Sequence, residues 1–513
     1  MKPIRLMRGF LTVGGWTLMS RVLGFVRDAL IAAYLGAGPA AEAFVVAFSL
    51  PNMFRRFFAE GTLNVAFVPM FAKKVEAGED ARGFAEDTLS ALAGMLLVLT
   101  IASMIFMPLL VSSMAAGFIG DSRFDLAVHY GRITFPYVLF ISLGALFSGI
   151  LNATGRFAAA AAAPVMLNII LSIAMVGAHI VSFDVATALV WAVPVAGIAQ
   201  LSIVWIVAKR AGFSLVPRLP RMTPELKALF ILAGPAALAG GVVQINLLVG
   251  RQVASFAEAG ALQYLNLADR LYQLPLGVVA IAIGVVLLPD LSRRLQAGDS
   301  TGARRAYNRA FEFALLLTIP AAVALIVMPQ ALIGVLFQRG AFSVSDAQAT
   351  AMAVAIYGLG LPAFVIQKVL QPLYFAREDT KTPFRFAVYS MVVNAGLAIG
   401  LSFWIGYLAA AVATSLAAWS MVILLWVGKK SMGDDVTADA QLRHRTPRIL
   451  IAAIAMGGIL YAAQIALAPL FDVSRLLATV MLIILGIISY FGIGQAIGAL
   501  NLRDIKSSVK RGG

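Results

Sequence analysis

The stretch LSALAGMLLVLTIASMIFMPLLV (residues 89–111) contains no charged side chain. A helix of about 20 apolar residues is long enough to cross the hydrocarbon core of a bilayer. The stretch LLATVMLIILGIISYFGIGQAIGAL (residues 476–500) is equally apolar, and neither stretch alternates apolar and polar residues as a transmembrane β-strand does. Runs of this kind recur along the chain, and they predict an all-α polytopic membrane protein.

The composition agrees with this class. Of the 513 residues, 61% are hydrophobic and 13% are charged, whereas soluble domains have about 25% charged residues. The formal net charge of +15 is concentrated in short segments between apolar runs, where cations orient helices and meet anionic lipids, so we expect no nucleic-acid partner. The chain has no cysteine and its three histidines are far apart. We therefore expect no metal and no cofactor.

The apolar runs predict fourteen transmembrane helices. Their approximate ranges are 9–36, 41–71, 84–113, 127–152, 157–180, 185–208, 224–250, 258–290, 305–328, 347–375, 383–405, 408–428, 448–468 and 474–500. With a cytoplasmic N-terminus, 29 Lys and Arg residues fall in cytoplasmic segments, 5 on the opposite side and 6 inside the spans. This asymmetry follows the positive-inside rule and predicts that both termini are cytoplasmic.

Four pairs of residues recur in order at offsets of 220 to 226: Gly38 and Gly260, Pro69 and Pro289, Pro136 and Pro362, and Asn168 and Asn394. They predict two pseudo-symmetric six-helix halves, residues 1–218 and 219–440. An additional C-terminal helix pair with a basic tail follows in residues 441–513. In such transporters the substrate site is expected between the halves, near the midplane of the membrane.

The first predicted span carries Arg21, Arg27 and Asp28. A charge at the bilayer centre costs roughly 2.5–3.5 kcal/mol on insertion scales, so charges there usually face protein or water and mark function. Arg21 and Asp28 are seven residues apart and share one face of the helix, where Ser20 and Gly24 form a surface suited to close packing. The polar stripe of this helix is therefore expected to face away from lipid.

Other predicted spans carry further charges: Glu42, Arg55, Arg56, Glu60, Asp269, Arg270 and Lys368. The six cations outnumber the four acids by two, which predicts an anion site. Arginine suits a phosphate ligand because its planar fork makes bidentate contacts. These charges also have a purely structural interpretation. Arg56 and Glu60 are four residues apart and can pair with each other, and such pairs often only lock helices together. Lys368 can extend its ammonium group to the membrane interface.

Four stretches resemble signature segments of the MurJ (MviN) lipid II flippases of the multidrug/oligosaccharidyl-lipid/polysaccharide (MOP) exporter superfamily. They are SRVLGFVRDALIAAYLGAG (20–38), AFSLPNMFRRFFAEGTLNVAFVP (47–69), ADRLYQLPLGVVAIAIGVVLLP (268–289) and AREDTKTP (376–383). The resemblance implies translocation of the lipid-linked peptidoglycan precursor across the bacterial inner membrane by alternating access. Lipid II would be the substrate, and anionic lipids and cell-wall synthesis proteins are possible partners.

The resemblance also implies roles for the charges. Arg21, Arg27, Arg55 and Arg270 would bind the diphosphate headgroup, and Asp28 would hold the arginines in place. Gate or supporting roles would fall to Glu42, Arg56, Glu60, Asp269 and Lys368, and the C-terminal pair would line a groove for the polyprenyl tail.

The residues bear differently on four alternative functions. A flippase for another polyprenyl-diphosphate-linked saccharide shares the diphosphate chemistry and stays open. A drug or cation antiporter is disfavoured because a net positive cavity repels cations, and a non-transporting scaffold has no need for intramembrane arginines. An enzyme is not expected, since the chain shows no nucleotide loop, metal cluster or triad spacing. With no ATP-binding motif, transport would draw on an ion gradient or the membrane potential.

Overall fold

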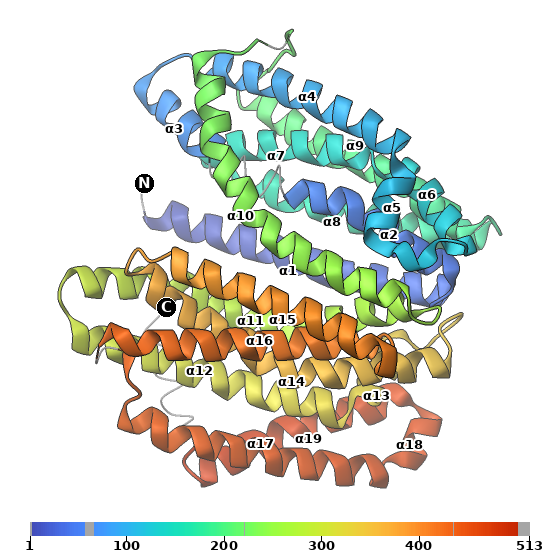
Figure 1. Cartoon of the computed structure of the whole chain (residues 1–513), viewed down its shortest axis with the longest axis vertical. Coiled ribbons are helices and arrows are strands. Elements are labelled where there is room, and N and C mark those ends of the chain that lie inside the picture. The colour runs from blue at the N-terminus through green and yellow to red at the C-terminus, as the bar shows by residue number, and fades with distance from the viewer. Residues whose placement is uncertain (1–2, 57–65, 220, 434–435, 501–513) are drawn as a thin grey trace. The chain divides into compact units, whose positions relative to one another are not determined.

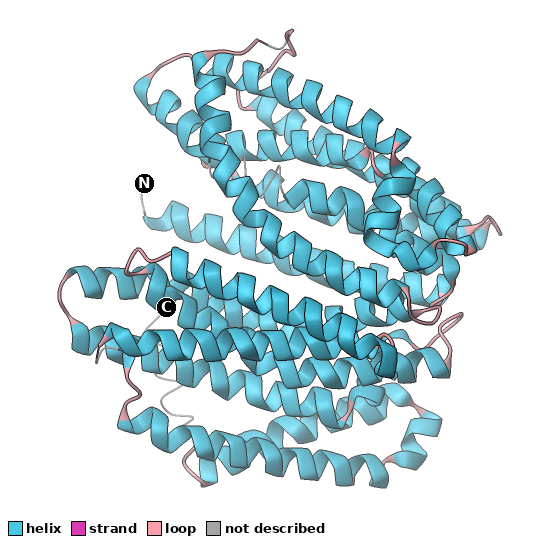
Figure 2. Ribbon diagram, in the orientation of Figure 1, coloured by secondary structure: helices cyan, strands magenta, loops and turns pink. Residues whose placement is uncertain are grey.

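The computed structural model describes residues 3–56, 66–219, 221–433 and 436–500, and all regular secondary structure in these ranges is helical (Figure 2). The expected all-α class is confirmed. The chain forms two compact units, one of residues 1–263 with 339–342 and the other of residues 264–338 with 343–513. The predicted division at residues 218 and 440 stays a prediction.

The first unit contains ten α-helices in its described part, together with one short 3-10 helix (Figure 1). They are α1 (Pro3–Leu35), α2 (Pro39–Arg55), α3 (Val68–Ala77), α4 (Ala81–Ile105), α5 (Met107–Ala115), η2 (Ala116–Phe118), α6 (Ser122–Thr134), α7 (Tyr137–Ala153), α8 (Phe157–Ile180), α9 (Val185–Arg210) and α10 (Pro224–Ser255). Helix α1 packs along α8, α8 and α7 pack against α9, and α2 packs against α6. Helix α8 is thereby placed to meet the charged stripe of α1.

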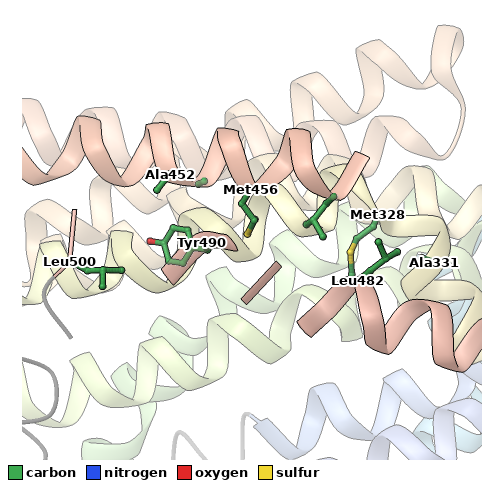
Figure 3. Close-up of a cluster of buried hydrophobic side chains, with 9 residues drawn as sticks. Met328, Ala331, Ala452, Met456, Leu482, Tyr490 and Leu500 are labelled. Atoms are coloured by element: carbon green, nitrogen blue, oxygen red, sulfur yellow. The ribbon is translucent and has the colours of Figure 1, made fainter. Parts of the chain in front are cut away.

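The second unit continues from α11, whose first turn belongs to the first unit. Its helices are α11 (Ala261–Gln296), α12 (Ser300–Val327), α13 (Pro329–Phe337), α14 (Val344–Phe375), α15 (Lys381–Ile405), α16 (Leu408–Gly428), η3 (Lys429–Met432), α17 (Ala440–Ala466), α18 (Ala468–Val473) and α19 (Arg475–Ala496). Helix α17 packs against α12 and α19, and a buried apolar cluster that includes Met328, Met456, Leu482 and Tyr490 joins them (Figure 3). The C-terminal helices are thus part of this unit's core.

Ten helical segments of the described chain are long and apolar enough to cross a membrane. They are Ala81–Ile105, Ser122–Ala153, Phe157–Ile180, Val185–Arg210, Ser300–Val327, Val344–Phe375, Lys381–Ile405, Leu408–Gly428, Ala440–Ala466 and Arg475–Ala496. The four other predicted spans, 9–36, 41–71, 224–250 and 258–290, include those that carry the intramembrane arginines. The protein is a multi-pass helical membrane protein, and the count of fourteen stays a prediction.

Helices break at proline in similar places of the two units. The sequence predicts a single span over 84–113, but α4 ends at Ile105 and α5 begins at Met107, just before Pro108. In the second unit, α12 ends at Val327 and α13 begins at Pro329. Proline cannot donate the backbone hydrogen bond that would continue the helix. The helices before these breaks also start alike, because Asp80 and Asp299 each cap the N-terminus with a side-chain oxygen.

The segment that follows α9 is bound to α4 through Glu86, whose side chain is buried. The Glu86 Oε1 atom accepts hydrogen bonds from Arg82 Nε at 3.0 Å and from the backbone N–H of Val216 at 3.3 Å. Arg218 forms an ion pair with Glu86 and donates its backbone N–H to Ser90 Oγ at 2.8 Å. These contacts fix residues 214–218 on the surface of α4.

The segment that precedes α17 is bound to α12 in a similar way. Arg304 Nε donates to the carbonyl oxygen of Thr437 at 3.2 Å, and Asn308 Nδ2 donates to the same oxygen at 2.9 Å. The Oδ1 atom of Asn308 accepts from the backbone N–H of Asp439 at 3.0 Å. Because Asp439 is the N-cap of α17, these bonds set where the C-terminal helices begin.

Lys429 lies directly after α16 and is 5% exposed. Its Nζ donates to Tyr307 Oη at 2.9 Å and to the carbonyl oxygen of Val436 at 3.0 Å, and it lies 3.5 Å from the centroid of the Trp426 ring. Burial lowers the pKa of Lys429 from 10.5 to about 8. The ammonium is therefore held in a small aromatic cage at the cost of desolvation.

We expect this burial to make stability depend on pH. Between the lowered pKa of about 8 and the usual 10.5, the unfolded chain binds more protons at Lys429 than the folded chain does, so the free energy of unfolding should rise with pH in this window. The rise is at most roughly 3 kcal/mol, because the aromatic rings favour the charged form. Melting temperatures of the wild type and Lys429→Met at pH 7.5 and pH 10 measure it. Identical pH profiles would contradict the prediction.

Candidate functional site

The guanidinium of Arg27 lies in a buried polar network between α1 and α8. Its Nε and Nη2 atoms donate to Asp28 Oδ1 at 3.0 and 2.7 Å, and Nη1 donates to Asn168 Oδ1 at 3.0 Å. The ring of Phe48 lies 5.9 Å away, within cation–π range. These contacts take three of the five N–H groups of the guanidinium. Among the described residues, one N–H on each terminal nitrogen is left for an anionic ligand.

The same network explains how α1 packs. Asn168 Nδ2 donates to the backbone carbonyl of Ser20 at 3.0 Å, one turn before Gly24. A Cβ atom at Gly24 would lie 3.6 Å from the amide of Asn168, which shows how closely the two helices approach. The stripe of Ser20, Gly24 and Asp28 therefore faces α8, as expected from its small residues.

The other predicted site residues of the first unit lie on α1 and α2. Arg21 is exposed, one turn and a half before Arg27 on α1, and Arg56 is exposed at the C-cap of α2. Arg55 is half-buried and lines a cavity of this unit. Glu60, with its expected pairing to Arg56, lies outside the described residues.

Three predicted site residues belong to the second unit. Asp269 on α11 is half-buried and accepts a hydrogen bond from Gln273 Nε2, one turn further along. Arg270 on α11 and Lys368 on α14 are exposed in this unit. The structure thus brings Arg27 and Asp28 together directly, and a single anion site that includes all the predicted cations stays a prediction.

Asn168 is a site residue that the sequence analysis used only as a repeat marker. It is 5% exposed in a largely apolar helix, and its amide bridges the Arg27 guanidinium to the backbone of α1. Its repeat partner Asn394 is also buried, at 2% exposure. A buried amide is costly unless it is hydrogen-bonded. An asparagine inside an apolar span was therefore the signal that could have identified it.

Glu42 joins three elements of the first unit. Its side chain is fully buried, its Oε2 accepts from Arg123 Nη1 at 3.0 Å, and its Oε1 accepts from the backbone N–H of Leu262, in the first turn of α11, at 3.0 Å. Arg123 Nε also donates to Asp121 Oδ2 at 2.7 Å, and its guanidinium lies 4.4 Å from the ring centroid of Phe118. Arg123 falls in none of the predicted spans, yet it is 7% exposed and pairs with Glu42.

An apolar groove lies in the second unit between α12, α17 and α19. Its volume is about 240 Å³, and its lining includes Leu316, Pro320, Met456, Gly486 and Tyr490. The hydroxyl of Tyr490 donates to the carbonyl oxygen of Leu316 at 2.7 Å, which leaves its ring as an apolar wall. The groove can accept a hydrocarbon chain and offers no charged group to a headgroup.

Within the described ranges, no group of three or more His, Asp or Glu side chains is arranged to hold a metal ion. The arrangement offers two kinds of binding surface: a cationic fork at Arg27 in one unit and an apolar groove in the other.

Comparison with known proteins identifies the family. The family model described as "Lipid II flippase MurJ" matches residues 31–482. The chain belongs to the lipid II flippase MurJ family. Two family members named "Probable lipid II flippase MurJ" match nearly the whole chain. The protein of Rhizobium tropici is 43% identical over 99% of this chain and 97% of its own length. The protein of Rhizobium meliloti (strain 1021) is 45% identical, also over 99% of this chain and 97% of its own length. The resemblance inferred from the four signature stretches is confirmed.

Solved structures agree with this family. A structure titled "Lipid II flippase MurJ, inward closed conformation" matches with a TM-score of 0.81 and 26% identity, over 96% of this chain and 99% of its own. An inward-facing multidrug resistance MATE transporter of the MOP superfamily matches with a TM-score of 0.67 and 13% identity, over 82% of this chain and 97% of its own. The second likeness shows a shared fold alone. The MurJ family is one of transporters, and the expected MOP fold is confirmed.

Proposed function

We propose that this protein translocates lipid II from the inner to the outer leaflet of the bacterial inner membrane. The observation that carries the proposal is the full-length match to lipid II flippases, 43% identical over 99% of the chain, in a protein whose first helix holds a buried arginine fork. Lipid II joins a polyprenyl chain to a saccharide and peptide through a diphosphate. A guanidinium with two remaining N–H groups suits one of these phosphates.

The proposed binding mode uses both units. Arg21, Arg27, Arg55 and Arg270 contact the diphosphate and the adjoining sugar, while Asp28 fixes Arg27. The apolar groove between α12, α17 and α19 accommodates part of the polyprenyl tail, since its lining is hydrocarbon apart from hydroxyl and backbone atoms. Each buried CH₂ group of such a tail contributes about 0.8 kcal/mol.

The proposed topology has fourteen transmembrane helices, both termini in the cytoplasm and two six-helix halves that alternate access to the site. The cationic cytoplasmic segments support this orientation and contacts with anionic lipids. Transport is coupled to a gradient or to the membrane potential, and no covalent chemistry is involved.

Complementation tests the proposal. In cells depleted of their own lipid II flippase, the wild-type chain should restore growth and wall synthesis, and Arg270→Ala should reach the membrane but fail, with at least roughly a tenfold loss of rescue, because a charge-assisted contact to phosphate is lost. Arg475→Ala, an exposed arginine at the start of α19, is the matched control and should rescue fully.

The second candidate is a flippase for another polyprenyl-diphosphate-linked saccharide. It is favoured if the wild type reaches the membrane and fails to restore wall synthesis, yet rescues cells that lack a flippase for a different lipid-linked sugar. Full rescue by Arg270→Ala would instead remove this residue from the binding site.

A further inference from the structure

A cavity of about 450 Å³ opens inside the first unit, lined by residues of α1, α2, α7, α8 and α9. Small-molecule sites in proteins have volumes of about 300–1,000 Å³. The cavity contains Arg55, which the proposed function places at the headgroup, but most of its surface comes from residues to which no role has been given so far.

Small side chains create this space. Helix α8 begins with the run FAAAAAAP (residues 157–164), and Ala160, Ala161 and Ala163 of that run line the cavity. Gly144 and Ala145 line it from α7, which packs against α8. Protein interiors are normally close-packed. These small residues of α7 and α8 therefore leave open a volume that larger side chains at the same positions would fill.

Two polar side chains of α7 point to a ligand in this space. Ser148 and Asn152 are one helical turn apart, both line the cavity and both are half-buried. Neither side chain hydrogen-bonds to another residue in the part of the chain that the structure describes. A hydroxyl and an amide in an apolar wall need hydrogen-bond partners. Water or a bound polar molecule can supply such partners in a cavity of this size.

The remaining polar group of the wall, Gln200, is already committed. Its Oε1 accepts from Tyr137 Oη at 2.9 Å, and its Nε2 donates to the carbonyl oxygen of Ala163 at 2.9 Å. It is 1% exposed and ties α9 to α7 and α8. Among the described residues, the uncommitted polar side chains of the wall are Ser148 and Asn152, and Arg55 adds a positive charge to the lining.

This combination selects the chemistry of the ligand. Arg55 suits a phosphate oxygen, whereas Ser148 and Asn152 suit neutral hydroxyl and amide groups, and the alanine surface suits the apolar face of a sugar ring. Resting on the proposed function, we infer that this cavity is the saccharide subsite of the flippase: it holds the N-acetylated sugar next to the diphosphate, with Ser148 and Asn152 determining specificity for a glycosylated headgroup.

Binding of two lipids to the full-length protein in nanodiscs tests the inference. The probes are lipid II and undecaprenyl diphosphate, which has the phosphates but no sugar. The variants are Asn152→Leu, which removes the amide but keeps the branched side-chain shape, and Ala161→Phe, which occupies part of the cavity. Ala159→Phe, in the same alanine run but outside the cavity lining, is the matched control.

Asn152→Leu should weaken lipid II binding by about tenfold, and Ala161→Phe by at least as much. Both should bind undecaprenyl diphosphate within about twofold of the wild type, and the control should bind both lipids normally. Unchanged lipid II binding by Asn152→Leu and Ala161→Phe, or equal losses for both lipids, would overturn the subsite while leaving the proposed function intact. A wild type that binds undecaprenyl diphosphate but not lipid II would overturn the proposed function as well.

Discussion

Arg27→Ala is expected to abolish flippase activity in the complementation assay. The change removes the charge-assisted bonds from Arg27 to Asp28 and Asn168 and the two N–H groups available to phosphate. A charge-assisted hydrogen bond contributes about 1.5–3 kcal/mol, so losing a bidentate contact lowers headgroup affinity by roughly 100-fold. Arg27→Lys keeps the charge but not the fork, and should retain a fraction of the activity.

A second variant separates binding from folding. Arg27→Ala leaves the Asp28 carboxylate buried without the guanidinium beside it, which by itself destabilises the first unit. In Arg27→Ala/Asp28→Asn the negative charge at position 28 is removed as well, so the melting temperature and membrane abundance should recover. Binding of undecaprenyl diphosphate should remain lost. If the double variant regains transport together with stability, Arg27 serves packing and the anion-site assignment is wrong.

Glu42→Ala is expected to lower the free energy of unfolding of the first unit by about 3–5 kcal/mol, because breaking a buried ion pair removes one of the two carboxylates that compensate the buried charge of Arg123. It removes the acceptor for Arg123 and for the backbone N–H of Leu262. Arg123 retains its bond to Asp121, which sets the loss at the lower end of this range. Thermal unfolding of the purified protein measures the effect, and Glu42→Gln should lose less because its amide oxygen still accepts a hydrogen bond.

A double-mutant cycle shows whether the two charges act on each other. If they do, Glu42→Ala/Arg123→Ala should be less destabilised than the sum of the two single variants. Strict additivity, or an unchanged melting temperature in Glu42→Ala, would contradict the pairing. The bonds of Glu42 connect α2 to α6 and to the first turn of α11. We therefore also expect that Glu42→Ala reduces transport activity by a larger factor than it reduces the amount of protein in the membrane.

The sequence predicted the helical membrane class and the family, and the resemblance implied that Asp28 holds the arginines of the first helix. Apolar runs reveal spans because an uncharged segment of sufficient length is stable in a bilayer whatever its neighbours are. The charges of α1 were identifiable because a charged side chain in lipid is energetically costly, so charges inside a span usually face protein or water and mark a functional site. Ser148 and Asn152 carried no comparable signal, because single polar residues are common in transmembrane helices.

Two prolines show what local sequence leaves open. Pro136 and Pro362 occupy corresponding positions of the predicted repeat, yet α6 ends at Thr134 and α7 begins at Tyr137, whereas α14 continues through Pro362. A proline removes one backbone hydrogen bond at both sites. Whether the helix then breaks depends on its neighbours. They decide whether the freed carbonyl group finds a hydrogen-bond donor and whether there is space for the proline ring.

The sequence by itself determined the helical membrane class and predicted the spans and the charges they carry, because the stability of an apolar segment in lipid depends on its own length and composition. The tertiary structure decided the partners: Asn168 for Arg27, Arg123 for Glu42, and the alanine run of α8 opposite Ser148 and Asn152. The first two pairings join helices far apart in the chain, and the third joins the consecutive helices α7 and α8. Their contacts are fixed by helix packing and hydrogen-bond geometry, which no local pattern encodes.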